Sequence, residues 1–191
     1  YSKGRAALKV INSLEKHSKN FINLSPFVVI SSKGKNGHAD VSPRGDSVGF
    51  VKIQDEKTII IPDRSGNNRL DTLENIIFDP SVGTLFFIPG INTVLRINGN
   101  AFIEDSLEIR AQFEINNNIP KTCIIINIEE IFMHCAKALM RSSFWDHSKY
   151  LSQTEFPTIS KIINDQLNSE DDEQNHEQED KRYKKQIIEF G

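Results

Sequence analysis

The sequence predicts a mainly β fold, an antiparallel β-barrel with flanking helices. Seven or so short strand-like runs occur in the first two thirds of the chain, and only a few helical patterns separate them. Gly- and Asn-containing turns join neighbouring runs, as in Lys33–His38. The run 94–103 contains Gly99, and a glycine inside a strand often marks the bend that closes a small barrel. Many short strands with turns between them are typical of barrels.

Each strand is predicted from a run rich in β-branched or aromatic residues that ends at a Gly, Pro, Asn or Asp signal. The expected strands are 27–32, 39–42, 49–53, 58–62, 82–89, 94–103 and 121–128. We expect the segment 42–46, Ser-Pro-Arg-Gly-Asp, to interrupt regular pairing.

Helices are predicted where apolar residues recur at helical spacing. An amphipathic helix is expected over 2–21, a short one over 70–78, another over 106–113 with Ser106 as N-cap, and a fourth over 132–145. Asp79-Pro80 ends the second of these, because the residue before a proline avoids helical geometry.

The character of the chain changes after about residue 150, so we predict a barrel domain over 1–150 and a helical, acidic extension over 151–191. In the extension, 159–167 is expected to be a helix, 169–180 a low-complexity acidic linker, and 181–190 a terminal helix. The linker holds too little apolar surface to order itself.

Composition excludes several classes of function. The net charge is -3, and many acidic residues gather in the extension, which leaves the barrel close to neutral and without the basic stripe of a nucleic-acid binder. The two cysteines have no metal-ligand spacing, which favours a reduced cytoplasmic compartment and no structural metal. No apolar run approaches membrane-spanning length. The chain opens at Tyr1, so removal of a leader stays open.

The segment 59–71, Ile-Ile-Ile-Pro-Asp-Arg-Ser-Gly-Asn-Asn-Arg-Leu-Asp, has the chemistry of a phosphate-binding loop. Gly66 lets backbone N–H groups approach an anion, Asn67 and Asn68 can donate hydrogen bonds, and Arg69 stands where the next helix begins. A simple polar turn explains the same composition, and this alternative stays open.

Four motifs in order resemble the pyridoxamine 5'-phosphate oxidase-like family of FMN-binding split barrels. They are 40–46 (DVSPRGD), 61–71 (IPDRSGNNRLD), 79–86 (DPSVGTLF) and 95–101 (LRINGNA). The segment from His134 to Trp145 is similar to one branch of that family. The resemblance implies a six-stranded antiparallel Greek-key split barrel. It also implies a homodimer with two FMN sites at the subunit interface, built from both chains.

The resemblance also implies residue roles. Asn67, Asn68 and Arg69 match the phosphate-binding segment, and Pro62 and Asp63 lie near the ribityl chain and ring edge. Ser42, Pro43 and Arg44 match the strand along the isoalloxazine. A second group of expected contacts comprises Thr93 and Arg96 on a strand, and Lys137, Arg141, Ser142 and Trp145 on the helix that the partner subunit presents.

The implied activity is that of an FMN-dependent oxidoreductase acting on an unidentified small molecule with an electron donor, and no side chain is required as a nucleophile. The founding enzyme's C-terminal substrate segment is not recognisable in 152–191, so a general activity of this class fits better than that enzyme's own. The alternative is a non-catalytic module that stores or senses flavin or binds haem. A nucleic-acid-binding barrel is disfavoured by the near-neutral body. Arg96 could instead pair with a carboxylate, and His38 and His134 lack a catalytic constellation.

Overall fold

The computed structural model describes residues 10–64, 66 and 69–190, and the chain divides into two compact units. The first comprises the chain up to Glu114 together with Ile119–Trp145. The second comprises Ile115–Asn118 and the chain from Asp146 onward. Each unit is described by itself.

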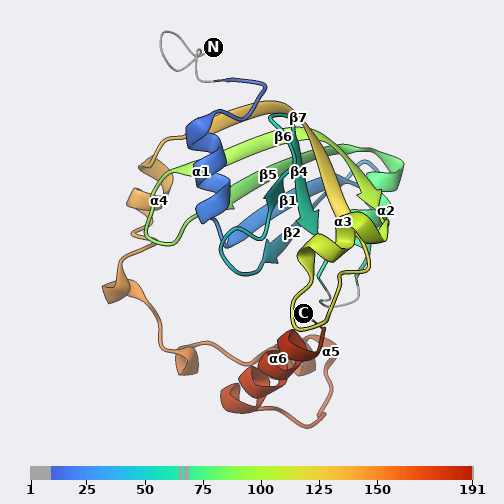
Figure 1. Ribbon diagram of the computed structural model, residues 1–191. Helices are drawn as coiled ribbons and strands as arrows, with labels where there is room; N and C mark the ends of the chain where they lie inside the picture. The colour runs from blue at the N-terminus through green and yellow to red at the C-terminus, as the bar shows by residue number, and fades with distance from the viewer. Residues whose placement is uncertain (1–9, 65, 67–68, 191) are drawn as a thin grey trace. The chain divides into compact units, whose positions relative to one another are not determined.

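The first unit is built on one seven-stranded antiparallel sheet with strand order β2-β1-β5-β6-β7-β4-β3 (Figure 1). The strands are β1 Phe27–Lys33, β2 Ala39–Gly45, β3 Lys52–Ile53, β4 Thr58–Pro62, β5 Ser81–Phe87, β6 Val94–Glu104 and β7 Cys123–His134. The predicted fold class is confirmed. The count of six strands is wrong, because the two-residue strand β3 pairs with β4 and adds a seventh.

The helices described in this unit have nine residues or fewer. They are α1 Lys16–Leu24, α2 Asp71–Phe78, α3 Leu107–Arg110 with the 3₁₀ turn Ala111–Phe113, and α4 Lys137–Arg141. Figure 1 shows α1 lying against the sheet, where Phe21 and Ile22 join the core. The core is formed by alternate residues of the strands, including Val28, Ile30, Phe86, Leu95 and Ile97.

The predicted N-terminal helix begins later than expected. Residues 1–9 lie outside the described residues, Ile11 pairs with Ile131 as an isolated bridge, and α1 starts at Lys16. Glu15 is the N-cap, and its carboxylate accepts hydrogen bonds from the amides of His17 and Ser18 at 2.7 Å each. This cap fixes the start of the helix.

Two other boundaries differ from the prediction. The segment 42–45 does not interrupt pairing, because β2 runs through to Gly45, with Pro43 opposite Val29. A proline is tolerated there since β2 is an edge strand. The expected helix over 132–145 is strand up to His134, which pairs with Val94, and only Lys137–Arg141 is α-helical.

The second unit contains two helices, α5 Ile159–Leu167 and α6 His176–Phe190, preceded by 3₁₀ turns at His147–Lys149 and Gln153–Glu155. The bounds of α5 agree with the prediction. Helix α6 begins five residues before the predicted start, with Glu177 and Glu179 in its first turn, where acidic side chains favour the helix dipole. Among the described residues, no helix is both long and apolar enough to cross a membrane.

Candidate cofactor-binding site

Two ion pairs join strand β2 to the chain that follows β4. Arg44 Nη2 lies 3.7 Å from Asp63 Oδ1, and Arg64 Nε lies 2.8 Å from Asp46 Oδ2. Strand β2 pairs in the sheet with β1 alone, and β4 pairs with β3 and β7. Within the described residues, the split between β2 and β4 is therefore bridged by charged side chains and not by a strand ladder.

Arg44 is held in one orientation by its neighbours. Its Nη1 donates to Ser42 Oγ at 2.5 Å and to the carbonyl of Pro43 at 3.0 Å, and its side chain is only 18% exposed. Its Nε–H is buried and has no hydrogen-bond partner in the part of the chain that the structure describes. Leaving a buried donor unpaired costs about 1–3 kcal/mol, and more for a charged group. Arg44 is therefore a cation held in one orientation, and its Nε–H is a donor that no described residue uses.

Asp63 is half-buried beneath this arginine. Burial raises the pKa of its carboxyl group, while the charge of Arg44 and a hydrogen bond from the Thr122 hydroxyl at 3.5 Å oppose the rise. The Asp63 amide also donates to the carbonyl of Thr122 at 3.0 Å, which ties this loop to the start of β7. The carboxylate thus positions Arg44 and is itself positioned by Thr122.

The raised pKa of Asp63 gives a testable pH dependence. The folded state binds this proton more readily than the unfolded state, so the contribution of Asp63 to the free energy of unfolding increases as pH falls from the raised pKa to the ordinary one. We expect carboxyl-carbon NMR to show a midpoint above the ordinary Asp value, and a still higher midpoint in Arg44→Gln, which lacks the opposing charge. A midpoint at or below the ordinary value would contradict this account of the site.

Arg96 belongs to a second polar cluster, on the face of β6 and β7 that points away from the core. Its guanidinium pairs with Glu130 and lies 5.2 Å from the ring centroid of Phe132. Asn98 also donates to Glu130, at 3.2 Å. The pairing with a carboxylate that the sequence left open is therefore present, yet Arg96 Nε is buried and no described residue accepts a hydrogen bond from it. Burial and the charge of Arg96 lower the pKa of His134, which contacts Phe132 edge-on.

The remaining predicted contacts lie near the end of β6 and on α4. Thr93 immediately precedes β6, and Trp145 Nε1 donates to the carbonyl of Ile91 at 3.0 Å, which fixes the indole against the same loop. The α4 region carries Lys137, Arg141 and Ser142, all exposed. No hydrogen bond or ion pair among the described residues joins this group to Arg44.

The predicted phosphate loop is only partly described. Asn67 and Asn68 lie outside the described residues, Gly66 is exposed, and Arg69 Nε donates to Asp71 Oδ2 at 2.7 Å. An open pocket of about 390 Å³ separates Arg69 and α2 from the β1–β2 turn. A larger pocket, of about 570 Å³, lies between α1 and the β3–β4 hairpin and is lined by none of the predicted residues.

The structure brings Ser42, Pro43 and Arg44 together with Asp63, which follows Pro62 at the end of β4. It adds three residues that the sequence does not single out, Asp46, Arg64 and Thr122. From the sequence alone, Asp46 belongs to an Arg-Gly-Asp tripeptide that is interpreted as a coincidental turn or a ligand-facing loop. The alternation of side chains along an extended strand could have indicated the role of Asp46, because it places residues 44 and 46 on the same face.

No cluster of three or more His, Cys, Asp or Glu side chains that could hold a metal ion occurs in the described ranges. Burial raises the pKa of the Cys123 thiol to about 11, which keeps it protonated and unreactive at neutral pH.

Comparisons with known proteins agree with this fold. HupZ of Group A Streptococcus is 19% identical, with a TM-score of 0.52 over 63% of this chain and 93% of that one. The conserved hypothetical protein Rv2991 of Mycobacterium tuberculosis is 13% identical, with a TM-score of 0.50 over 80% and 99%. At these identities the likeness shows the fold alone. No curated protein matches the chain.

The family model described as pyridoxamine 5'-phosphate oxidase matches residues 14–135. That range contains all seven strands and the Arg44–Asp63 cluster. A candidate pyridoxamine 5'-phosphate oxidase from Lactobacillus delbrueckii is a further solved structure with this fold, at 18% identity and a TM-score of 0.50 over 64% of this chain and 95% of that one. The chain belongs to the pyridoxamine 5'-phosphate oxidase family.

Proposed function

We propose that the chain binds FMN and is an FMN-dependent oxidoreductase of the pyridoxamine 5'-phosphate oxidase-like class, acting on a small molecule. The observation that carries the proposal is the oriented guanidinium of Arg44, whose buried Nε–H has no hydrogen-bond partner among the described residues. It lies in the 42–44 segment that resembles the flavin-facing strand of the family. Family membership over residues 14–135 supports the same assignment.

The residues of the site fit an anionic, planar cofactor. Arg44 supplies a positive charge fixed by Ser42 and Asp63, and β2 is an edge strand whose ladder partner within the described residues is β1 alone. The outer edge of such a strand presents backbone N–H donors to a ligand. When bound, FMN supplies two-electron and one-electron redox chemistry, while the protein orients it and tunes its potential. A cation at the ring edge favours the reduced, more negative state.

The phosphate is assigned to the loop before α2. Arg69 is described there and is exposed, and its guanidinium fork suits a phosphate. Asn67 and Asn68 are proposed as further phosphate contacts on the basis of the sequence. Asp63, which follows Pro62, pairs with Arg44, so the loop begins beside this arginine.

We propose a homodimer with FMN at the subunit interface. The sheet face that carries Arg96 also exposes apolar side chains, including Phe27 and, half-buried, Leu85 and Phe132. A second copy packed on this face would cover the partly exposed pair of Arg96 and Glu130. Thr93 and Trp145, with Lys137, Arg141 and Ser142 of the α4 region, are the residues proposed to reach the partner's flavin. Two free cysteines are consistent with a cytoplasmic location, which we also propose.

The visible spectrum tests the binding, and bleaching tests the activity. We expect the purified protein, after addition of FMN and gel filtration, to retain a flavin spectrum that a nicotinamide donor bleaches and air restores. A retained spectrum that no donor bleaches supports storage instead of catalysis. Loss of all flavin on gel filtration at micromolar protein would contradict both functions.

Replacing Arg69 tests the phosphate assignment. We expect Arg69→Ala to weaken FMN binding by about 1.5–3 kcal/mol, the cost of one lost charge-assisted hydrogen bond, and to leave riboflavin binding unchanged because riboflavin lacks the phosphate. Fluorescence titration with both ligands measures the difference. Lys35→Ala, on the opposite wall of the pocket, is the matched control and should alter neither affinity. Equal losses for both ligands would place the phosphate elsewhere.

A further inference from the structure

The two-helix unit has no apolar core of its own. Among its described residues, none of the apolar side chains is buried, and its buried residues are the polar Asn164 and Glu179, which are 7% and 6% exposed. A segment of this size cannot bury enough apolar surface to fold on hydrophobic contacts alone. Within the unit, the described apolar side chains are therefore left at least partly exposed.

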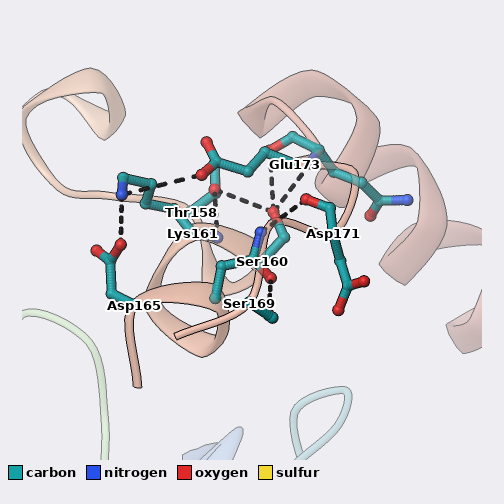
Figure 2. A network of polar contacts seen from close by, with 9 residues as sticks. Thr158, Ser160, Lys161, Asp165, Ser169, Asp171 and Glu173 are labelled. Carbon is teal, nitrogen blue, oxygen red and sulfur yellow. Dashed lines mark hydrogen bonds and ion pairs between the residues drawn. The ribbon is translucent and has the colours of Figure 1, made fainter. Parts of the chain in front are cut away.

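Polar contacts, seen in Figure 2, give the unit its internal order. The Glu179 carboxylate accepts from the amides of Ile159 and Ser160 at 3.1 and 2.8 Å, which caps the start of α5 from α6. Asn164 donates to the carbonyl of Asp171 at 2.7 Å and accepts from the Ser169 hydroxyl at 3.1 Å. The acidic segment expected to be a loose linker is thereby tied to α5, and these contacts use the polar face of that helix.

The other face of α5 carries an exposed apolar stripe. Ile159, Ile163 and Leu167 recur every four residues and are 45%, 46% and 69% exposed. On α6, Tyr183 and Ile187 repeat the same spacing at 41% and 69%. Exposed apolar groups in a row at helical spacing are typical of a helix that packs against another helix.

The unit also carries two charge blocks of opposite sign. The loop 170–173 is Glu-Asp-Asp-Glu, and α6 carries a basic block at 181–185. Some of these charges pair within the unit, as Lys161 does with Glu173 and Lys181 with Glu177. No ion pair among the described residues uses Glu170, Asp172 or Lys184. The same unit therefore presents an acidic surface and a basic surface that complement each other.

We propose that this helical unit is a self-association surface, in which the α5 stripe packs against the same unit of a second copy. The acidic loop 170–173 of one copy then faces the basic block 181–185 of the other. A surface that carries both signs can meet itself across a two-fold axis, with each contact made twice. Four helices brought together in this way bury the stripes that two helices leave exposed. The contact is independent of any flavin bound to the barrel.

Zero-length carbodiimide coupling of the full chain tests the contact, because it joins lysines to carboxylates only where they touch. We expect a covalent dimer whose peptides link Lys184 or Lys185 to Glu170 or Asp172, and we expect that link to be absent from the monomer band. The double variant Ile163→Asp, Leu167→Asp should reduce the linked dimer about tenfold or more, the effect of about 1.4 kcal/mol. Asp165→Asn, on the opposite face of α5 from the stripe and exposed, is the control and should leave it unchanged.

Charge reversal separates this arrangement from docking onto the barrel. Lys184→Glu with Lys185→Glu, and Glu170→Lys with Asp172→Lys, should each lose the linked dimer when alone and regain it when mixed. Circular dichroism checks that both retain their helices. Links from Glu170 or Asp172 to lysines outside the unit would overturn the proposal, as would links confined to the monomer band or no recovery on mixing.

Discussion

Arg44→Ala is expected to weaken FMN binding about tenfold to a hundredfold, the equivalent of about 1.5–3 kcal/mol for one charge-assisted hydrogen bond. The Arg44 guanidinium is oriented by Ser42 and Asp63, and its buried Nε–H has no acceptor within residues 10–64, 66 and 69–190. A cofactor that accepts from this donor loses both the bond and the charge in the variant. Isothermal titration of the purified protein measures the change.

The substitution also leaves the Asp63 carboxyl group without its cation, so folding must be measured beside binding. Lys52→Ala is the matched control, because Lys52 also donates to a backbone carbonyl, that of Gln112, and lies over the ring of Phe113. It should change the free energy of unfolding without changing FMN affinity. Unchanged FMN affinity in a folded Arg44→Ala variant would show that Arg44 does not contact the cofactor.

Gly99→Ala is expected to destabilise the barrel by about 2–4 kcal/mol. A Cβ at position 99 would lie 2.1 Å from the carbonyl oxygen of Asn127, a backbone atom that cannot move without disturbing the β6–β7 ladder. The register of that ladder shifts between Asn98 and Gly99, so the glycine sits at the irregularity that bends the strand. Urea unfolding followed by fluorescence measures the loss.

Gly66→Ala is the control for this experiment. A Cβ there meets no atom of the described residues within 4 Å, and the φ angle of Gly66 lies outside the range from +20° to +160° that disfavours side chains. The free energy of unfolding of apo Gly66→Ala should stay within about 0.5 kcal/mol of the parent. If the free energy of unfolding of Gly99→Ala were equally unchanged, the backbones of β6 and β7 could not approach as closely at Gly99 as the structure shows.

The strands were predictable because their side chains alternate and their ends carry turn residues. The run Phe27–Lys33 alternates between exposed and buried positions as a strand with one face on the core should. The run Thr58–Pro62 is buried almost throughout, so its composition and not its alternation identifies it. The Gly kink at Gly99 was also predicted and coincides with the register shift.

Other boundaries depend on contacts that the local sequence does not encode. Phe132 and His134 have helical spacing with residues further on, yet pairing with Arg96 and Val94 keeps them in β7. Proline at position 43 suggested a break, but an edge strand needs no amide there. Arg64 and Asp46 are 18 residues apart, and only the closure of the barrel brings them together.

Titration of the cofactor-free protein with FMN and with riboflavin tests the central claim most directly, since that claim is a phosphate-bearing flavin held beside Arg44. Quenching of flavin fluorescence should saturate at one FMN per chain, with riboflavin bound at least about tenfold more weakly because it cannot use the loop at Arg69. No saturable quenching, or equal affinity for FMN and riboflavin, would contradict the account.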